Sequence, residues 1–373
     1  MDSVETIKVA TLQAQQHLTT DEDALLAAFR SLTMEQANIL AQWTLQRYDA
    51  RPDRLDWQQL LARIANFVDG GLLGMYSELL TRELFWPGAM YRGADPASRD
   101  HLIRRVEDRA PDRKALNDLL LCLAWIGDET VQDLFRSWRV HPPAWRTALY
   151  SPPESYAVEA DWELTPAGER RDLFYTTSYE LVAVDRTVGM EGANPVRAAV
   201  SEPVAGKECG WCGRNLSILF ALDLRDSRLA FLGLSGTSLH IARCDFCSPY
   251  ATVFTDVDLE GDVRWSASNG PQPVDFDSGW AEYPLVGRQL VLGPRRRTSA
   301  ETVGIYQGAH NSELGGHPDW IQDAEYPACP ECQRRMTFIG QVEPDDVIEN
   351  AEGITYAFLC AECGKAATTY QQT

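Results

Sequence analysis

Eight of the nine cysteines in this 373-residue chain stand in Cys-x-x-Cys pairs, and this pattern limits the fold more than any other feature. The four pairs are Cys209/Cys212, Cys244/Cys247, Cys329/Cys332 and Cys360/Cys363. Two residues between thiolates let one tight turn direct both sulfurs at a single ion, and a second such turn completes a tetrahedron around Zn²⁺. The pattern therefore predicts two zinc ions, each held by four cysteines.

The intervals between the pairs suit a ribbon-like site in each half of this region. Cys212 and Cys244 are separated by 31 residues, and Cys332 and Cys360 by 27, which is room for a strand, a turn and a returning strand. An alternative that the spacing leaves open is a site formed across the halves, by the first Cys-x-x-Cys pair together with the last. Four thiolates close the zinc shell, so we expect structural rather than catalytic ions.

Two other uses of paired cysteines are disfavoured. A redox pair belongs at a helix start in a thioredoxin-like βαβ pattern, whereas these pairs stand between strand-like runs. Structural disulfides require an oxidising compartment, and residues 1–5 show no basic region followed by an apolar core, so we expect no secretory signal and a cytoplasmic protein.

The sequence around the pairs is repeated. Residues 207–214 resemble 327–334, and 241–247 resemble 358–363. Runs of β-branched and aromatic residues predict strands at 179–184, 217–222, 252–255 and 289–292. We expect a duplicated β-rich domain over 175–373, with halves of about 175–265 and 266–373.

Residues from about 21 to 150 have apolar side chains at helical spacing instead. Helix pairs are expected to begin near Asp21, Asp56, Pro96 and Asp128, a period of 32 to 40 residues that is typical of HEAT-like arrays. An irregular helical bundle is the alternative. The segment 114–126 is apolar nearly all round, so it should be buried with Cys122 as a core residue.

The chain thus belongs to the α+β multidomain class. We expect a helical domain at 1–150, an ordered connector rich in proline and aromatic residues at 151–174, and the β-rich domain at 175–373. The longest apolar run, 119–126, is far too short to cross a bilayer.

The formal net charge is −20 and is unevenly distributed. Residues 1–150 carry 17 basic and 21 acidic side chains (net −4), and residues 151–373 carry 17 and 33 (net −16). Such a surface repels nucleic acids and anionic membranes and favours a basic protein partner, although many acidic proteins are charged only for solubility.

The chain lacks the common signatures of hydrolases, nucleotide-binding proteins and zinc peptidases, so we expect no enzymatic activity. The acidic run Asp256, Asp258, Glu260 and Asp262 is expected to be an exposed hairpin turn. A turn of this charge is a candidate contact for a basic partner.

Residues 314–322, Leu-Gly-Gly-His-Pro-Asp-Trp-Ile-Gln, followed by Cys329-Pro-Glu-Cys332 and 336–341, resemble the bacterial YwqG-like family and its eukaryotic relatives, the programmed cell death protein two group. Gly315 and Gly316 allow positive φ, and Trp320 supplies an apolar anchor. A structural turn is favoured here over a ligand site. The resemblance covers about 175–373, and many YwqG-like proteins lack the cysteine pairs.

The resemblance implies a duplicated β-rich domain used in protein binding. Eukaryotic relatives are thought to chaperone a basic ribosomal protein, and bacterial relatives include presumed immunity proteins. Our leading hypothesis is a cytosolic immunity protein that blocks the active site of a cognate toxin, such as a nuclease. The alternatives are a chaperone for a basic ribosomal or nucleic-acid-binding protein and, third, a zinc-dependent enzyme. Trp320 joins the acidic turn as a candidate partner contact.

Overall fold

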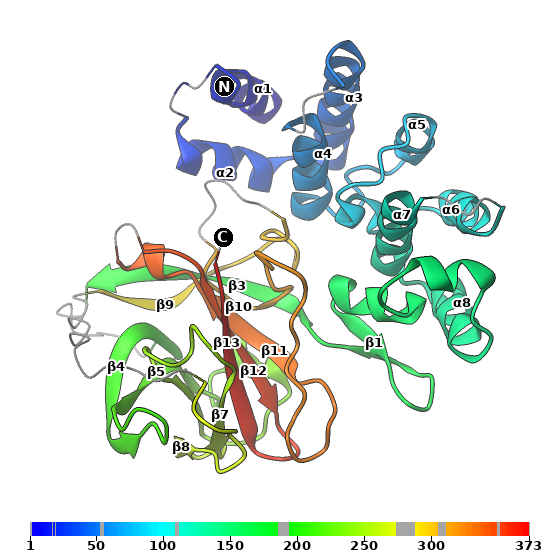
Figure 1. Ribbon diagram of the computed structural model, residues 1–373. Coiled ribbons are helices and arrows are strands. Elements are labelled where there is room, and N and C mark those ends of the chain that lie inside the picture. The colour runs from blue at the N-terminus through cyan, green and yellow to red at the C-terminus, as the bar shows by residue number, and fades with distance from the viewer. Residues whose placement is uncertain are drawn as a thin grey trace. The chain divides into compact units, whose positions relative to one another are not determined.

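The computed structural model describes residues 2–16, 18, 20–52, 56–108, 112–185, 194–273, 288–304, 311–348 and 351–372. The chain divides into two compact units (Figure 1). The helical unit comprises Met1–Asp172 with Ala300–Ala309, and the β unit comprises Leu173–Ser299 with His310–Thr373. The predicted fold class, a helical N-terminal region followed by a duplicated β-rich region with two Cys₄ clusters, is confirmed.

The described part of the helical unit contains α-helices, short 3₁₀-helices and one small hairpin. The α-helices are α1 (Ser3–Ala14), α2 (Glu22–Ser31), α3 (Met34–Ala50), α4 (Asp56–Phe67), α5 (Tyr76–Thr81), α6 (Pro96–Asp108), α7 (Arg113–Ile126) and α8 (Glu129–Val140). The 3₁₀-helices are η1 (Gly88–Tyr91), η2 (Ala144–Ala148) and η3 (Pro153–Ala160). The hairpin consists of β1 (Trp162–Leu164) and β2 (Arg170–Asp172).

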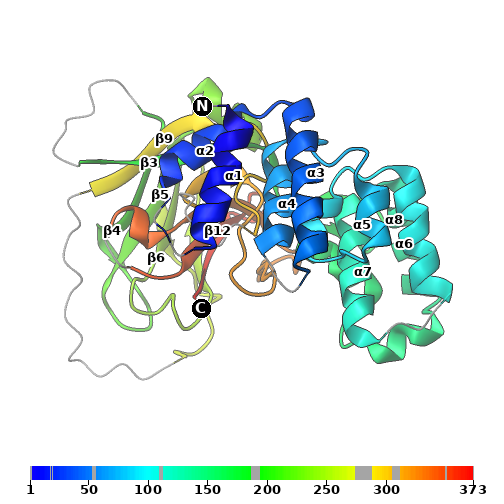
Figure 2. The ribbon, with the colours of Figure 1, turned by 90° about the horizontal axis from the view of Figure 1, so that it is seen from above.

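Local capping signals explain why these helices begin where the sequence predicts. The carboxylate of Asp21 accepts a hydrogen bond from the backbone N–H of Ala24, and that of Asp128 accepts one from Val131. Each satisfies a donor that the first helical turn leaves without a partner. Consecutive helices pack in pairs, α1 on α2, α3 on α4 and α6 on α7. The pairs expected to begin near Asp21 and Asp56 are therefore wrong, because the first two pairs begin at Ser3 and Met34, whereas the pair that begins at Pro96 is confirmed. Figure 2 shows α3 to α8 side by side as a stacked array.

Helix α7 lies in the core of this unit, as its all-round apolar surface predicts. Leu120 and Leu123 are fully buried, and the buried Sγ of Cys122 lies 3.1 Å from the carbonyl oxygen of Phe85. Helix α1 precedes the region in which helices were expected. Its apolar contacts are confined to a narrow stripe around Ile7, which explains why the periodicity there is weak.

Residues 151–174, expected to form a connector, fold onto the helical unit as far as Asp172. Trp162 carries much of this packing, because its indole stacks on Phe135 at 5.8 Å and donates a hydrogen bond to the carbonyl of Ala124 at 2.9 Å. A second piece of the chain, beginning at Ala300, also belongs to this unit. There, the fully buried carboxylate of Glu301 pairs with Arg30 at 3.1 Å.

Over its described residues, the β unit is built on one antiparallel sheet of eleven strands. The strands are β3 (Tyr175–Asp185), β4 (Val196–Glu208), β5 (Asn215–Asp223), β6 (Ser238–Arg243), β7 (Val253–Val257), β8 (Val263–Trp265), β9 (Arg288–Arg295), β10 (Glu313–Gly316), β11 (Thr337–Val342), β12 (Ile354–Cys360) and β13 (Lys365–Gln371). Two 3₁₀-helices, η4 (Ser227–Leu232) and η5 (Pro344–Asp346), connect strands.

The sheet curls until its two ends meet. Its strand order is β6-β5-β4-β9-β3-β10-β11-β12-β13-β7-β8. At the closing edge, the backbone N–H groups of Thr237 and Ser238 both donate to the carbonyl of Leu259, which lies between β7 and β8. The apolar core of this unit includes the buried side chains of Phe220, Ile339 and Leu359.

The strand order reveals the duplication. Each strand of the first half has a counterpart in the second half: β3 corresponds to β9, β4 to β10, β5 to β11, β6 to β12 and β7 to β13. When β8 is left out and every strand is exchanged for its counterpart, the order around the closed sheet stays the same. The exchange works because β3 of the first half pairs with β10, and β9 of the second half pairs with β4. The halves 175–265 and 266–373 are therefore structural repeats that share one sheet, and they are not separate bodies.

The Gly-Gly turn at the end of β10 has the backbone that its sequence predicts. Gly315 and Gly316 have φ of 73° and 77°, and a Cβ on Gly315 would lie 2.3 Å from the carbonyl oxygen of Thr177. Only glycine fits such an approach. Within the described residues, no helix combines the length and apolar character needed to cross a membrane.

Candidate metal centres

The structure brings the eight paired cysteines together in two groups of four. The first cluster consists of Cys209, Cys212, Cys244 and Cys247, and the second cluster consists of Cys329, Cys332, Cys360 and Cys363. The sulfurs of each group all lie within 4.8 Å of one another. Pairing thus occurs within each half of the repeat, which settles the choice that the spacing had left open.

Equivalent strands position the ligands of both clusters. In the first cluster, one cysteine pair lies between β4 and β5 and the other follows β6. In the second cluster, one pair precedes β11 and the other joins β12 to β13. Because β5 and β6 are neighbours in the sheet, as are β11 and β12, each pair of neighbouring strands presents its two turns at the same end.

The leading turns of the two clusters share one backbone conformation. The N–H of Cys209 donates to the carbonyl of Arg214 at 2.7 Å, and the N–H of Cys329 donates to that of Arg334 at 2.8 Å. The residue after the second cysteine is left-handed in both turns, with φ of 72° at Gly213 and 60° at Gln333. The duplication therefore preserved both the ligands and the turn.

The sulfur spacing fits a tetrahedral tetrathiolate site. A metal–sulfur bond of about 2.3 Å places tetrahedral sulfurs about 3.8 Å apart. The Cys209 and Cys247 sulfurs are 3.8 Å apart, and those of Cys212 and Cys244 are 3.5 Å apart. In the second cluster, the Cys332 and Cys360 sulfurs lie at 3.8 Å. Each cluster can hold one metal ion, with all four coordination positions filled by protein.

Without an ion, the four thiols of each cluster share protons unequally. Hydrogen bonds from the thiols of Cys244 and Cys247 lower the pKa of Cys209 to about 2. In the second cluster, the backbone N–H of Arg334 and its guanidinium lower the pKa of Cys332 to about 6. Both shifts favour the thiolate, which is the form that binds metal.

The two clusters differ in what covers them. In the first cluster, the third position of each Cys-x-x-Cys turn is aromatic, Trp211 and Phe246. Trp211 packs edge-on against Trp265 of β8 at 4.9 Å, and the guanidinium of Arg214 lies 3.6 Å from the centre of the Phe246 ring. Three of the four sulfur-bearing residues are buried, and Cys212 is half-buried.

In the second cluster, the same two positions are the exposed acids Glu331 and Glu362. Arg334, which corresponds to Arg214, forms an ion pair with Glu362, and Lys365 lies 3.2 Å from Glu331. Only Cys329 is buried here, and the other three cysteines are half-buried. Comparing the two repeats position by position reveals this difference in the sequence, but the cysteine spacing alone does not.

The acidic turn is exposed at its tip, but its charges are engaged within the fold. The carboxylate of Asp256 pairs with Lys365 at 2.6 Å, and that of Asp262 pairs with Lys207 at 2.6 Å. Asp258 accepts hydrogen bonds from the backbone N–H groups of Glu260 and Asp262, while Glu260 accepts one from Thr237. These contacts fix the β7–β8 hairpin.

Trp320 lies half-buried in an aromatic cluster of the β unit. Its ring centre is 4.6 Å from that of Tyr356 and 5.2 Å from that of Tyr326. The Tyr356 hydroxyl donates to the carbonyl of Asp319 at 2.7 Å, which holds the loop after the Gly-Gly turn. These contacts give Trp320 the anchoring role that a structural turn requires.

One set of buried charges was not foreseen from the sequence. Glu313 and Arg296 are almost completely buried in the β unit, with 3.3 Å between a carboxylate oxygen and Nε, and Ser178 donates to the same carboxylate at 2.8 Å. The two charged residues are 17 positions apart in the sequence, so no local pattern links them. This pair lies where β3 meets β10 in the sheet.

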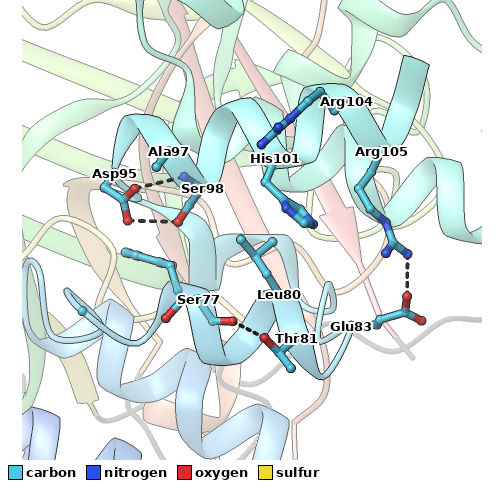
Figure 3. A pocket seen from close by; sticks show the side chains of 12 residues that line it. Ser77, Leu80, Thr81, Glu83, Asp95, Ala97, Ser98, His101, Arg104 and Arg105 are labelled. Carbon is cyan, nitrogen blue, oxygen red and sulfur yellow. Dashed lines mark hydrogen bonds and ion pairs between the residues drawn. The ribbon is translucent and has the colours of Figure 1, made fainter. Parts of the chain in front are cut away.

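The helical unit has a shallow cavity of about 580 Å³ between α5 and α6 (Figure 3). Its walls carry both signs of charge, because Arg105 pairs with Glu83 at 2.6 Å and Asp95 accepts hydrogen bonds from Ser98. His101 points into the cavity from α6. The lining is therefore largely engaged in local contacts and defines no ligand class.

Fold and sites together define a two-unit protein, with a helical array and a curled sheet that carries two groups of four cysteines, each of which could hold a metal ion. No family model matches the chain, and no solved structure matches it. The uncharacterized protein YpfL of Salmonella typhimurium is 36% identical over 326 residues, which cover 85% of this chain and 72% of YpfL. The chain belongs to the family of YpfL. Because 85% exceeds the share of either unit, the similarity includes parts of both units.

Proposed function

We propose that this chain is a zinc-stabilised immunity protein, which binds a basic toxin and blocks its active site. The observation that carries the proposal is the surplus of acid in residues 151–373, where 33 acidic residues face 17 basic ones. An inhibitor with a negative surface gains both association rate and specificity against a cationic enzyme.

Zinc is the metal that suits the two clusters. Soft thiolates in a tetrahedral arrangement select Zn²⁺ or iron–sulfur clusters, and two Cys-x-x-Cys turns on a β-ribbon are typical of structural zinc. The sulfur separations of 3.5 to 3.8 Å match a single zinc ion. Bound zinc would supply structural cross-links, since the closed shell leaves no position for a substrate.

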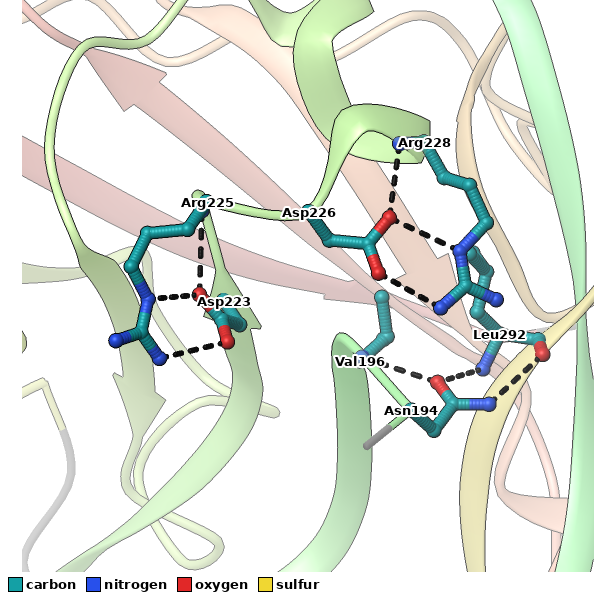
Figure 4. A network of polar contacts seen from close by, with 7 residues as sticks. All are labelled: Asn194, Val196, Asp223, Arg225, Asp226, Arg228 and Leu292. Atoms are coloured by element: carbon teal, nitrogen blue, oxygen red, sulfur yellow. Dashed lines mark hydrogen bonds and ion pairs between the residues drawn. The ribbon is translucent and has the colours of Figure 1, made fainter. Parts of the chain in front are cut away.

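The basic side chains of the β unit are largely matched by neighbouring carboxylates. Arg225 pairs with Asp223, and Arg228 pairs with Asp226 (Figure 4). Hydrogen bonds from the Arg228 side chain lower the pKa of Asp226 to about 2. The same figure shows Asn194, whose side chain forms hydrogen bonds to the backbone of Val196 in β4 and of Leu292 in β9 and so links these two strands. Local pairing leaves the acidic surplus to face solvent and a partner.

Exposed carboxylates outside the engaged turn are the better contacts to test. Asp323 and Glu325 lie in the loop that follows the Trp320 segment, and both are exposed. No ion pair to either side chain occurs within the described parts of the chain. By contrast, reversing Asp256 or Asp262 would break contacts with Lys365 and Lys207 and would test folding together with binding.

The resemblance of residues 314–341 to YwqG-like proteins supports a protein-binding role, because presumed immunity proteins occur among the bacterial relatives. It also supplies the second candidate. The eukaryotic relatives are thought to chaperone a basic ribosomal protein, so a chaperone for such a protein is the alternative.

The test is co-expression with the product of each neighbouring gene that arrests growth. We expect this chain to restore growth against one such toxin and to co-purify with it. The association rate should fall as salt rises, because screening weakens steering between opposite charges. Protection against several unrelated toxins, or against none, would contradict the immunity proposal, and capture of a ribosomal protein would support the chaperone.

A matched pair of double variants locates the contact. Asp323→Lys with Glu325→Lys changes the net charge by +4, and so does Glu35→Lys with Glu107→Lys on exposed positions of the helical unit. We expect at least tenfold weaker toxin binding from the first pair and less than a twofold change from the second. Equal weakening by both pairs would mean that total charge matters and this surface does not.

A further inference from the structure

The two clusters have the same ligands and turns but unequal access for solvent. In the first cluster, Cys244 and Cys247 have no exposed surface. In the second cluster, Cys332, Cys360 and Cys363 are each partly exposed. Thiol reactivity follows exposure and a cationic neighbourhood, so identical ligand sets in these two settings should react at different rates.

The third positions of the turns account for the difference. Trp211 and Phe246 cover the first cluster, and the added ring of Trp265 contacts Gly210 so closely that a Cβ there would lie 2.5 Å from its Nε1. In the second cluster, the same positions are the exposed acids Glu331 and Glu362, which place no apolar ring over the sulfurs. A hydrophobic shell controls solvent access to a metal, and only one cluster has such a shell.

A cation also lies beside the exposed sulfurs. The guanidinium of Arg334 lies beside Cys332 and forms an ion pair with Glu362. The corresponding Arg214 stacks on Phe246 instead. A nearby guanidinium can stabilise the hydroxide that leaves when a peroxide bond is broken.

We propose that the second cluster is an oxidation site, where a hydroperoxide converts two ligands to a disulfide and releases the metal ion, while the first cluster keeps its ion. This inference rests on the proposed zinc occupancy. The favoured pair is Cys332 with Cys360, because both are accessible and their sulfurs are only 3.8 Å apart. A disulfide between Cys332 and Cys360 would join the two turns that the ion otherwise holds together.

The reaction balances with a hydroperoxide as the only oxidant. The Cys332 thiolate attacks the terminal oxygen, the O–O bond breaks, and a sulfenic acid forms with loss of hydroxide or alkoxide. The Cys360 thiolate then attacks the sulfenic sulfur and expels hydroxide as the S–S bond forms. Two electrons pass from the two sulfurs to the peroxide, and solvent protonates the leaving oxygens. The ion departs with water because two of its four ligands are lost.

The fold around the second cluster can survive this change. Strands β12 and β13 remain paired from Ile354 with Gln371 to Cys360 with Lys365, so the cluster lies at one end of a complete hairpin. Strands β11 and β12 are also paired along their length. Loss of the ion should therefore loosen the turns that carry Cys332 and Glu362 without opening the sheet.

The experiment uses the full zinc-loaded chain, hydrogen peroxide and a chromogenic zinc chelator, with peptide mapping by mass spectrometry. We expect one zinc ion per chain to be released at least tenfold faster than the other, together with a Cys332–Cys360 disulfide that dithiothreitol and added zinc reverse. Equal release of both ions, earlier release from the first cluster, or release without a disulfide in the second cluster would overturn the proposal.

Exchanging the covering residues tests the cause. Glu331→Trp with Glu362→Phe should slow release from the second cluster about tenfold, and Trp211→Glu with Phe246→Glu should make the first cluster release its ion comparably fast. Circular dichroism and initial zinc content establish whether each variant is folded and loaded. If the purified chain binds no zinc, the metal proposal fails separately, and differential alkylation of the thiols still measures whether the second cluster reacts first.

Discussion

The two metal clusters began as copies of one site and now differ in their surroundings. Both have four cysteines, the same leading turn and neighbouring antiparallel strands. The first cluster is covered by aromatic rings, and the second is bordered by acids. Coordination fixes the ligands and the left-handed position of the turn, whereas the intervening side chains are free to change. The same constraint therefore produced one protected site and one accessible site.

The cover also changes how each cluster supports the fold. Removing an ion from a buried site leaves four sulfurs in an apolar environment, where any thiolate charge is poorly solvated. At the second cluster, water can reach the sulfurs and replace part of the lost coordination. We therefore expect the first cluster to contribute more to the stability of the β unit.

The largest predicted effect is the difference between one ligand substitution in each cluster. Cys247→Ser should destabilise the β unit by more than about 4 kcal/mol, because loss of a buried metal site is among the most damaging single changes. Cys332→Ser should lower stability by about 1 to 3 kcal/mol and leave the sheet folded. Denaturant unfolding of zinc-loaded protein, followed by circular dichroism, measures both.

Zinc content is the control for this pair, since each variant should lose one of its two ions. A Cys332→Ser protein as unstable as Cys247→Ser would show that exposure does not separate the two sites.

A smaller effect is expected from the two equivalent arginines. Arg214→Ala removes a cation–π contact with Phe246 and should cost about 1 kcal/mol. Arg334→Ala removes an ion pair whose partners are 41% and 72% exposed, and we expect no measurable change in melting temperature. A larger loss from Arg334→Ala would mean that this ion pair, not the aromatic contact, is the stronger link between turns.

The smallest effect concerns the left-handed residue of each leading turn. Gly213→Gln should cost about 1 kcal/mol, because a side chain at φ of 72° is strained even though nothing lies within 4 Å of the new Cβ. Gln333→Gly should raise stability by less than Gly213→Gln lowers it, because the substitution also removes the hydrogen bond from the Gln333 side chain to the carbonyl of Pro330. Thermal unfolding with saturating zinc measures both variants. Gly213→Gln should lower the melting temperature and Gln333→Gly should raise it, and a shift in the same direction for both would contradict this prediction.

Features that depend on neighbouring residues were predictable from the sequence. The cysteine spacing predicted two tetrathiolate groups, and the acids at Asp21 and Asp128 predicted helix starts, because a cap and its helix are close in the chain. The hairpin at 256–262 was predicted for the same reason, since Asp258 bonds to backbone only two and four residues away.

Features that depend on distant residues were not predictable. Strand β3 of the first half pairs with β9 of the second half, which lies about a hundred residues further along the chain. Likewise, Lys365 neutralises Asp256 from a distance of 109 residues, which makes part of the expected binding turn structural. Trp162 was assigned to a connector, yet it packs on Phe135 in the helical core. Neither the period of the apolar residues nor the spacing of the cysteines carries information about such long-range contacts.

Zinc analysis with X-ray absorption on the gently purified full chain shows whether both clusters bind metal through sulfur alone. We expect two zinc ions per chain, each surrounded by four sulfurs at about 2.3 Å. One ion or none, or a fit that requires nitrogen or oxygen ligands in place of sulfur, would contradict the assignment of two tetrathiolate centres.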